Sequence, residues 1–462
     1  MKLTSKYVRC LGAILLVSIM IFSGCGDDIG IGIEKVSPSK VESETGTTGE
    51  SGPASPDEAE EKDPVSGKTQ DEGKGETEGS SPQDQNSESR EQQSQNAQSE
   101  SSSSNEEEPE SPQPVSITIS AAGDVTMGNY IGQGYENSFR QTYEKQEDKS
   151  YFFKNVYDIF SRDDMTIVNL EGTLTFSEEP NPGRTYNIKG DPEYAYLLNY
   201  GSIEAVSMAN NHRMDFGEEG AKDSVAAVKA AGVAYAYDNV LGTYEVNGIK
   251  IGWVSVNEIA YGTGIEKILE KGITKLKAQG ANLILACCHW GIERENYPED
   301  YQKEVGRKCI DWGADLVLGH HPHVLQGIEE YQGKYIVYSL ANFCFGANRN
   351  PADKDTMIFQ QTFTFEALAG DLTNREGAAT QGTSQMPEGT TTKEKMVYGT
   401  AQPGEARMIP CSVSSVTHRN DYCPTPLTGE DGQRVIDRIN EYSKDFGVTV
   451  DSDGVLSHTG RE

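Results

Sequence analysis

Short apolar runs rich in β-branched residues recur along the chain from residue 115 onward, and each run stops at a polar residue. Segments with helical periodicity lie between these runs. The apolar runs are residues 117–122, 165–168, 205–208, 283–288, 315–318 and 335–340, and the helical segments are residues 151–161, 193–198, 218–231, 264–278 and 300–312. Strands that alternate with helices predict an α/β fold with largely parallel pairing.

The polar residues after these runs are candidate site residues, because ligands of parallel sheets bind at the carboxyl ends of the strands. Five of the seven histidines lie there, three of them within four positions. A lone loop histidine is more often structural, but this density favours a metal site. Carboxylate and imidazole ligands suit Zn, Mn or Fe. The sequence therefore predicts one or two divalent ions, which polarise a substrate oxygen and acidify bound water.

The N-terminus has the pattern of an export signal. Lys2, Lys6 and Arg9 precede an apolar stretch at residues 11–22, which is shorter than the roughly 20 residues of a membrane span. Small residues directly before Cys25 resemble a bacterial lipobox. Residues 1–25 are thus expected to be a lipoprotein-type signal peptide with lipidation at Cys25, or alternatively an uncleaved anchor. Either interpretation predicts an extracytoplasmic protein held at the cell membrane.

Charge and composition separate a stalk from a domain. The net charge is −32, and residues 26–114 hold 23 acidic and 6 basic residues with no aromatic residue. Such a Ser-, Glu-, Gln- and Gly-rich segment buries too little apolar area to fold, so we expect a disordered stalk. One domain is expected at 115–462, with a polar insertion at about 371–400. Nucleic acid is disfavoured as a partner because no basic surface is evident.

Six motifs, in this order, resemble those of the CapA-type capsule and poly-γ-glutamate synthesis proteins. They are Gly123-Asp124-Val125-Thr126-Met127-Gly128, Asn169-Leu170-Glu171-Gly172, Ala209-Asn210-Asn211-His212 with Asp215-Phe216-Gly217, His289-Trp290-Gly291 with Glu293, Gly319-His320-His321-Pro322-His323-Val324, and Tyr338-Ser339-Leu340-Ala341-Asn342-Phe343. The resemblance covers roughly residues 116–365. It implies a four-layer α/β/β/α sandwich similar to that of calcineurin-like metallophosphoesterases.

The resemblance also implies roles for individual residues. His212 matches a histidine that protonates a leaving group. The implied metal ligands are Asp124, Glu171 or Asn169 as the bridging residue, Asn211, His289, and a final pair formed by His321 with His323 or by His320 with His323. The chain departs from the metallophosphoesterase pattern at Thr126, where a histidine is usual, and the bridging Asp is absent from its usual Gly-Asp context. Both changes weaken the first metal site and favour one tightly held ion, or a pair with altered chemistry.

The sequence leaves more than one role open for several neighbouring residues. Glu293 is a general base, an orienting partner of His289 or a plain surface residue. Arg213 meets an anionic substrate group or forms a salt bridge, and Asn342 bonds into the site or shapes a turn; Asn169, Arg213 and Asn342 are the candidate substrate contacts. Ala341 stands where the family usually has glycine.

The cysteines constrain the fold less. Cys287 and Cys288 are expected in the core, whereas Cys411 and Cys423 are either free or joined by a disulfide.

The sequence is compatible with three functions. The family resemblance implies a membrane-anchored protein of capsule or poly-γ-glutamate synthesis or export, with the anionic polymer and capsule synthase subunits as partners. A metal-dependent hydrolase, either phosphoesterase or amidase, and a non-catalytic polymer-binding module are the alternatives. Because the domain is itself acidic, binding a polyanion needs a local positive focus, which metal with Arg213, Arg184 and Lys189 would supply.

Overall fold

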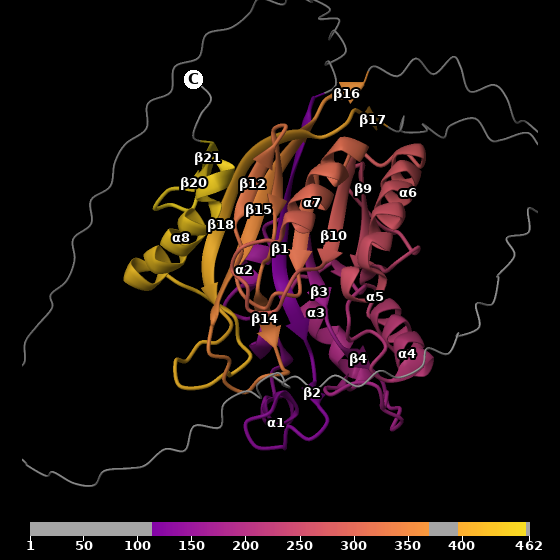
Figure 1. Cartoon of the computed structure of the whole chain (residues 1–462), viewed down its shortest axis with the longest axis vertical. Helices are drawn as coiled ribbons and strands as arrows, with labels where there is room; N and C mark the ends of the chain where they lie inside the picture. Colours follow the sequence, from indigo (N-terminus) through magenta and orange to yellow (C-terminus); the bar gives the residue numbers. More distant parts are fainter. Residues whose placement is uncertain (1–112, 369–395, 459–462) are drawn as a thin grey trace, which may run out of the picture. The chain divides into compact units, whose positions relative to one another are not determined.

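Two β-sheets packed face to face form the centre of the fold (Figure 1). The computed structural model describes residues 113–368 and 396–458, which all fall in one compact unit. The expected signal peptide with Cys25, nearly all of the expected stalk and most of the 371–400 insertion lie outside the described residues.

The first sheet has the strand order β19-β18-β15-β1-β3-β6-β7, with β14 also paired to β1. Its strands are β1 (Val115–Thr126), β3 (Met165–Leu170), β6 (Ala205–Ser207), β7 (Ala234–Ala236), β14 (Asn342–Phe345), β15 (Asp355–Phe365), β18 (Gln402–Ser412) and β19 (Thr425–Pro426). The run β1-β3-β6-β7 is parallel, as predicted, but β15, β18 and β19 are antiparallel. β14 also pairs with β1 in parallel, so the expected parallel pairing is wrong for three of the seven strand pairings of this sheet.

The second sheet has the order β12-β13-β11-β10-β9-β8, and its four inner strands are parallel. Its strands are β8 (Gly242–Val246), β9 (Ile249–Asn257), β10 (Leu283–His289), β11 (Leu316–His320), β12 (Ile328–Tyr331) and β13 (Lys334–Val337). The polar strand ends predicted from the sequence are thus divided between two sheets.

Apolar side chains fill three layers and confirm the predicted four-layer α/β/β/α sandwich. Between the sheets, Ile119 and Ile167 of the first pack with Trp253 and Leu285 of the second. The outer face of the first sheet is covered by the helices of residues 139–230, and that of the second by α6 (Ile265–Ala278) and α7 (Asp300–Trp312) (Figure 1). Cys287 and Cys288 point to opposite sides of β10 and are both buried, as expected.

The helices largely follow the predicted periodicity. They are α1 (Phe139–Lys145), η1 (Lys149–Phe152), α2 (Tyr157–Phe160), η2 (Pro192–Ala195), α3 (Tyr196–Tyr200), α4 (Gly217–Ala230), α5 (Glu258–Tyr261), η3 (Gly262–Gly264), α6 (Ile265–Ala278), α7 (Asp300–Trp312), α8 (Gly429–Ser443) and η5 (Lys444–Phe446). The helix expected at 151–161 is broken into η1 and α2. The break falls at Phe153, which follows η1 with φ −126° and ψ 6°, and α2 begins only after Val156.

Short strand pairs complete the described part of the chain. They are the sheet of β2 (Asn129–Tyr130), β5 (Ile188–Gly190) and β4 (Thr173–Leu174), the pair β16 (Ala367–Leu368) with β17 (Val397–Tyr398), and the pair β20 (Val448–Val450) with β21 (Leu456–His458). Cys411 and Cys423 are both buried as free thiols, so the disulfide alternative is not realised. Instead, the Cys423 Sγ lies 3.2 Å from the carbonyl oxygen of Tyr151.

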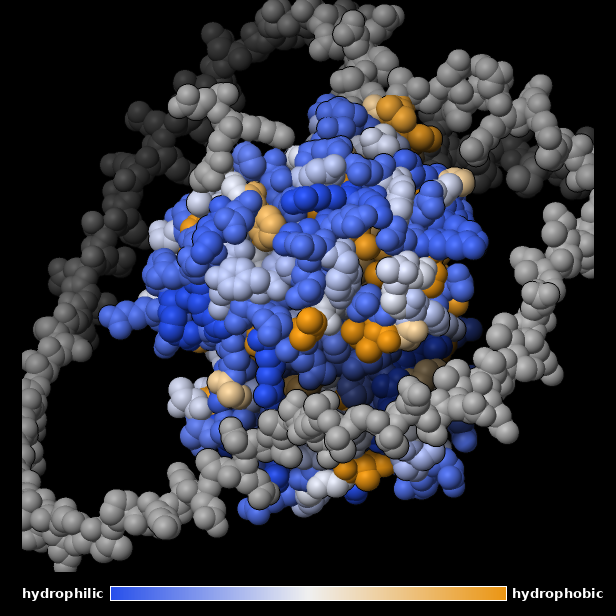
Figure 2. All heavy atoms as spheres, viewed as in Figure 1, coloured by the Kyte–Doolittle hydropathy of each residue, from blue (hydrophilic) through white to orange (hydrophobic). Residues whose placement is uncertain are grey.

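The visible face of the molecule is mostly hydrophilic, with small separate apolar areas (Figure 2). Among the described residues, no helix has both the length and the apolar character that a membrane crossing requires.

Candidate metal centre

Strand register aligns polar residues in one row across the first sheet. Asp124 of β1 lies opposite both Asn342 of β14 and Asn169 of β3, and Asn169 lies opposite Ser207 of β6. A register shift between Ala122 and Asp124 interrupts the regular pairing at this point. The row thus places an acid and two amides at one end of the sheet.

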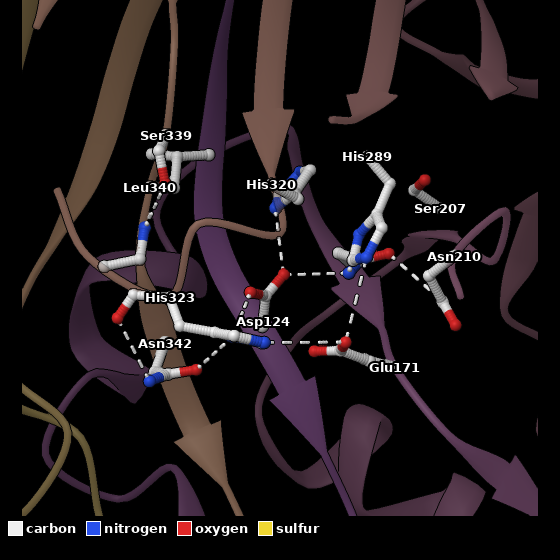
Figure 3. Close-up of polar contacts among 12 residues, drawn as sticks. Asp124, Glu171, Ser207, Asn210, His289, His320, His323, Ser339, Leu340 and Asn342 are labelled. Atoms are coloured by element: carbon white, nitrogen blue, oxygen red, sulfur yellow. Dashed lines mark hydrogen bonds and ion pairs between the residues drawn. The ribbon is translucent and has the colours of Figure 1, made fainter. Parts of the chain in front are cut away.

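A second row runs across the other sheet, where His289 of β10 lies opposite His320 of β11 and Asn257 of β9. The two rows meet at the end of the sandwich (Figure 3). The Nδ1 of His320 lies 3.4 Å from the Oδ1 of Asp124, and the Asn169 Nδ2 lies 3.3 Å from the Nδ1 of His289. The strand-end residues predicted from two separate sheets therefore form one cluster.

Glycine allows the close backbone approach that forms this cluster. A Cβ at Gly123 would lie 1.9 Å from the carbonyl oxygen of Ala341, and one at Gly319 would lie 1.9 Å from that of Tyr338. The Ala341 carbonyl accepts a hydrogen bond of 2.9 Å from the backbone N–H of Asp124. Ala341 itself has φ 61°, a conformation that favours glycine, which explains the family's preference there.

Glu171 is the buried acid at the centre of the cluster. Its Oε1 lies 3.8 Å from the Nε2 of His289, 3.9 Å from that of His323 and 4.0 Å from that of His212. Neither of its carboxylate oxygens accepts a hydrogen bond from any described residue. Burial raises the pKa of Glu171 to about 7, against the lowering effect of the charge on His323.

His323 lies between the two buried acids. Its Nδ1 is 3.1 Å from the Oδ2 of Asp124 and 2.9 Å from the Oδ1 of Asn342, and its Nε2 faces Glu171 (Figure 3). Although burial lowers the pKa of His323, Glu171 and Asp124 raise it to about 10. For the acid Asp124 the effects are reversed: burial raises its pKa, but His320 and His323 hold the pKa well below its usual range. The centre thus attracts positive charge.

Burial favours the neutral imidazoles of His289 and His321. It holds the pKa of His289 well below its usual range, with the neighbouring His321 adding to the effect, and lowers that of His321 to about 3. The Nε2 of His289 lies 2.8 Å from the Oδ1 of Asn211, so both atoms point toward the same region. A neutral imidazole is the form that binds a metal ion.

His212 reaches the centre from the loop after β6, and the structure gives it a partner. Its Nδ1 lies 2.7 Å from the Oδ2 of the fully buried Asp215. The sequence does not by itself give Asp215 this role, although its position three residues after His212 is a usable signal. Burial lowers the pKa of His212, while Asp215 and Glu171 raise it above its usual value overall.

Two groups of side chains bring their ligand atoms close enough to share a metal ion, with all atoms of a group within 4.8 Å of one another. One group is Asp124, Glu171 and His323, and the other is Glu293, His321 and His323. The structure thus places Glu293, which is exposed, beside His321 and His323. Asn342 bonds His323 in two ways, since its Nδ2 also donates to the His323 carbonyl over 3.2 Å.

Two other residues singled out in the sequence are Arg213 and Thr126. The side chain of Arg213 leaves the cluster and stacks on Tyr237 instead. Thr126 is buried, and its hydroxyl has no hydrogen-bond partner among the described residues.

Comparison with known proteins identifies the family. The family model for the bacterial capsule synthesis protein PGA_cap matches residues 118–347. The PGA biosynthesis protein CapA of Bacillus subtilis (strain 168) is 29% identical over 248 residues, which cover 49% of this chain and 62% of that protein. The capsule biosynthesis protein CapA of Bacillus anthracis is 26% identical over 253 residues, covering 49% and 59%. This chain therefore carries a CapA-type capsule synthesis domain, as its motifs predicted.

Two further proteins match the chain at lower sequence identity. A probable polyglutamine synthesis accessory protein of Mycobacterium tuberculosis is 23% identical over 211 residues, covering 38% of this chain and 54% of that protein. A solved structure of a hypothetical protein from Thermus thermophilus aligns over 54% of this chain and 94% of its own, with 17% identity and a TM-score of 0.33. The matched part spans about 60% of the two CapA proteins.

The donor set fits a divalent cation. Oxygen and nitrogen atoms converge, and several have no hydrogen-bond partner among the described residues: Asp124 Oδ2, both oxygens of Glu171, His320 Nδ1 and His321 Nδ1. Buried polar atoms without partners are costly, and a bound cation satisfies them. The residues that would hold it are Asp124, Glu171, Asn211, His289, His320, His321 and His323.

Proposed function

We propose that this protein acts outside the cytoplasm in the synthesis or export of capsule or poly-γ-glutamate, through a divalent metal site at the strand ends. Membership of the CapA-type family supports the biological role. The ring of histidines around two buried acids supports the metal site. Mn, Zn and Fe all suit this donor set.

The observation that carries the metal proposal is Glu171. A fully buried carboxylate whose two oxygens lack hydrogen bonds from the described residues is strongly destabilising unless a cation compensates it. Three imidazole nitrogens lie within 4.0 Å of its Oε1. A buried acid without hydrogen bonds lowers the stability of the fold, and titratable groups perturbed in this way cluster at functional sites.

The reaction that this arrangement suits is hydrolysis. A divalent ion bound there would polarise a substrate oxygen and acidify a water molecule. His212, held by Asp215, presents its Nε2 toward the same centre as Glu171 and is placed to give a proton to a leaving group. A phosphoester or an amide of a cell-envelope substrate is the target class.

We further propose that Cys25 is lipidated and anchors the chain at the membrane, with residues 26–114 as a spacer. The support is the leader at residues 1–25 and the acidic, aromatic-free composition that follows it. Intact-mass measurement of the membrane-extracted protein tests this, with a Cys25→Ser variant as control. A mature chain that begins at Cys25 without a lipid would contradict the anchor.

Metal analysis of the purified full-length chain tests the site. We expect Glu171→Gln, Asp124→Asn and His289→Ala to lose most of the bound metal. Asp223→Asn on α4 is the matched control, because it removes a carboxylate that bonds Thr175 away from the centre. Unchanged metal in all three site variants, in chains that remain folded, would refute this ligand set.

A second candidate is a module that binds polymer without turnover. Thr126 favours it, because a threonine hydroxyl without a described partner stands where metallophosphoesterases carry a histidine ligand. Assays of the metal-loaded chain on phosphoesters and on poly-γ-glutamate separate the two candidates. Polymer binding without any cleavage of either substrate class would favour the non-catalytic role.

A further inference from the structure

One of the two groups of ligand atoms is built from two neighbouring loops. Glu293 lies in the loop of residues 291–299, which follows β10, and His321 and His323 lie in the loop of residues 321–327, which follows β11. The ligand atoms of these three side chains lie within 4.8 Å of one another. Their grouping therefore depends on how the two loops are held together.

The 291–299 loop has little structure of its own. Among the described residues, its one internal backbone hydrogen bond runs from the Glu295 N–H to the Ile292 carbonyl over 3.3 Å. Arg294 has φ 66°, in the left-handed region that favours glycine, and both Glu293 and Arg294 are exposed. Contacts from outside the loop must therefore fix its conformation.

The 321–327 loop is strained as well. His321 has φ 97° and His323 has φ 59°, so two residues that carry ligand atoms lie in the left-handed region without being glycine. Residues keep such a conformation only where their surroundings determine it. One such contact is the hydrogen bond of 3.3 Å that the Gln326 N–H donates to the Ser339 carbonyl.

Within the described part of the chain, three hydrogen bonds join the two loops, and each is donated to a backbone carbonyl of the opposite loop. They run from Arg294 N to Pro322 over 2.8 Å, from Gln326 Nε2 to Glu295 over 2.8 Å and from Asn296 Nδ2 to Leu325 over 2.9 Å. Two of the three donors are amide side chains, Asn296 from the first loop and Gln326 from the second. We call these two residues the loop clasp.

Gln326 is the buried member of the clasp. Its side chain is fully buried, and its Oε1 accepts a hydrogen bond of 3.1 Å from the Nε2 of Gln302 in α7. Gln302 is also fully buried, and its Oε1 accepts the N–H of Glu299 over 2.8 Å. Buried amides are costly without partners, whereas a satisfied network makes the residues that it joins more rigid. Gln326 thus ties the 321–327 loop both to the 291–299 loop and to α7.

Helix α7 also fixes the start of the first loop. The Gly291 N–H donates to the Tyr301 hydroxyl over 2.6 Å, and a Cβ at Gly291 would lie 2.9 Å from the side-chain amide of Gln302. Because α7 holds residue 291 and the clasp holds residues 295 and 296, Glu293 lies between two fixed points of the chain.

We propose that Gln326 and Asn296 are positioning residues of the metal centre, which hold the carboxylate of Glu293 beside the imidazoles of His321 and His323. The proposal rests on the proposed function, because it requires a metal ion in this cluster. Residues that orient metal ligands typically change metal affinity by about ten- to a hundredfold when they are replaced. Both clasp residues lie outside the motifs that identified the site.

The Zn²⁺ affinity of the full-length chain, measured by competition with a chelator of known affinity, tests the clasp. We expect Gln326→Leu, which is similar in size but lacks both amide bonds, to weaken Zn²⁺ binding about tenfold or more. Asn296→Ala should weaken it about threefold, in the lower range for loss of one hydrogen bond. The visible absorption spectrum of bound Co²⁺, which depends on the geometry of the ligands, should change in both variants.

Combination with Glu293→Gln separates positioning from general destabilisation. If the clasp acts through Glu293, Gln326→Leu should weaken Zn²⁺ binding much less in the Glu293→Gln chain than in the wild type. A clasp that only supports the fold would reduce the affinity by the same factor in both chains. Asn296→Ala repeats the comparison at a half-buried position, in a chain that keeps its buried amides.

Two matched controls lie outside the two loops. Gln361→Leu makes the same substitution at a buried glutamine of β15 whose side-chain amide has no hydrogen-bond partner among the described residues. Asn440→Ala removes a half-buried asparagine of α8 that forms two hydrogen bonds with the backbone of Val450. Neither control should change the Zn²⁺ affinity, although Asn440→Ala should lower the melting temperature.

The outcomes distinguish this proposal from the proposed function. A wild-type chain that binds Zn²⁺, with Gln326→Leu and Asn296→Ala binding it equally tightly, would overturn the clasp alone. A wild-type chain that binds no metal would overturn both proposals. Losses of equal size with and without Glu293→Gln, or losses matched by the two controls, would also overturn the positioning role.

Discussion

The Nδ1 of His212 lies 2.7 Å from the Oδ2 of Asp215, and the same carboxylate oxygen accepts the backbone N–H of Ile188 over 2.7 Å. Asp215 is fully buried, so the bond to Ile188 fixes its orientation from outside the loop that carries both residues. With Nδ1 held by Asp215, the Nε2 of His212 faces Glu171. The pair therefore determines which ring nitrogen faces Glu171 and the candidate metal centre.

Asp215→Asn is expected to impair proton delivery while leaving metal bound. An amide at this position does not stabilise a charged imidazole, so we expect hydrolysis to slow by about a hundredfold, the lower range for loss of a general acid. The effect should be larger for a phenolate than for a nitrophenolate leaving group, because the latter needs less protonation. Paired assays with these two phosphodiesters measure it.

Metal content and melting temperature of the same Asp215→Asn preparation serve as controls. An equal loss of rate on both substrates would show that Asp215 acts through structure and not through His212.

Glu171→Gln is expected to change stability in opposite directions with and without metal. In metal-free protein the substitution removes a buried charge that lacks hydrogen bonds from the described residues, so the melting temperature should rise. With excess Mn²⁺ or Zn²⁺ the wild type gains stability from binding, and the variant should gain much less. Thermal melts in chelator and in metal measure both effects. A variant less stable than wild type in chelator would contradict this account.

Gly123→Ala is expected to disrupt the site through the backbone. The new Cβ would lie 1.9 Å from the Ala341 carbonyl oxygen, which is itself bonded to the Asp124 N–H. Relief requires β1 and the Ala341 loop to separate, at a cost of more than about 3 kcal/mol and with loss of metal. Denaturant unfolding and metal analysis measure these losses. Gly264→Ala is the control, because the nearest atom to its Cβ would be 3.8 Å away.

The sequence was sufficient to predict the residues that gather at the centre because strand ends are local features. Asp124 and His289 each end an apolar run, and parallel pairing then brings such ends to one edge. The antiparallel strands of the first sheet were not predicted. Strand β15 pairs with β1 from the other end of the domain, Val115 opposite Phe365, and local periodicity does not reveal a pairing across so long a separation.

Details that depend on distant contacts were also beyond sequence reasoning. The direction of Arg213 is set by Tyr237, which directly follows β7, the neighbouring strand of the sheet. The break at Phe153 within the helical pattern of residues 151–161 is another such detail, because both Phe152 and Phe153 pack into the core beneath the first sheet's helices. Tertiary packing overrides local periodicity at this point.

Asp163→Asn is expected to stabilise the protein at alkaline pH and not at acidic pH. Asp163 precedes β3, far along that strand from the metal centre, and accepts a hydrogen bond of 2.6 Å from Thr166 Oγ1. Burial raises the pKa of Asp163 to about 7, with Glu204 and Asp164 adding to the effect of burial and hydrogen bonds from Ser120 and Thr166 opposing it.

Because this pKa is higher in the folded than in the unfolded chain, the stability that protonated Asp163 supports is complete below about pH 4 and is lost as the pH rises through about 7. Asparagine cannot ionise, so the variant should melt several degrees above wild type at pH 8 and at the same temperature at pH 4. Melting curves across this range, with the exposed Asp158→Asn as control, measure the difference. A constant offset at all pH values would mean that ionisation of Asp163 is not its cause.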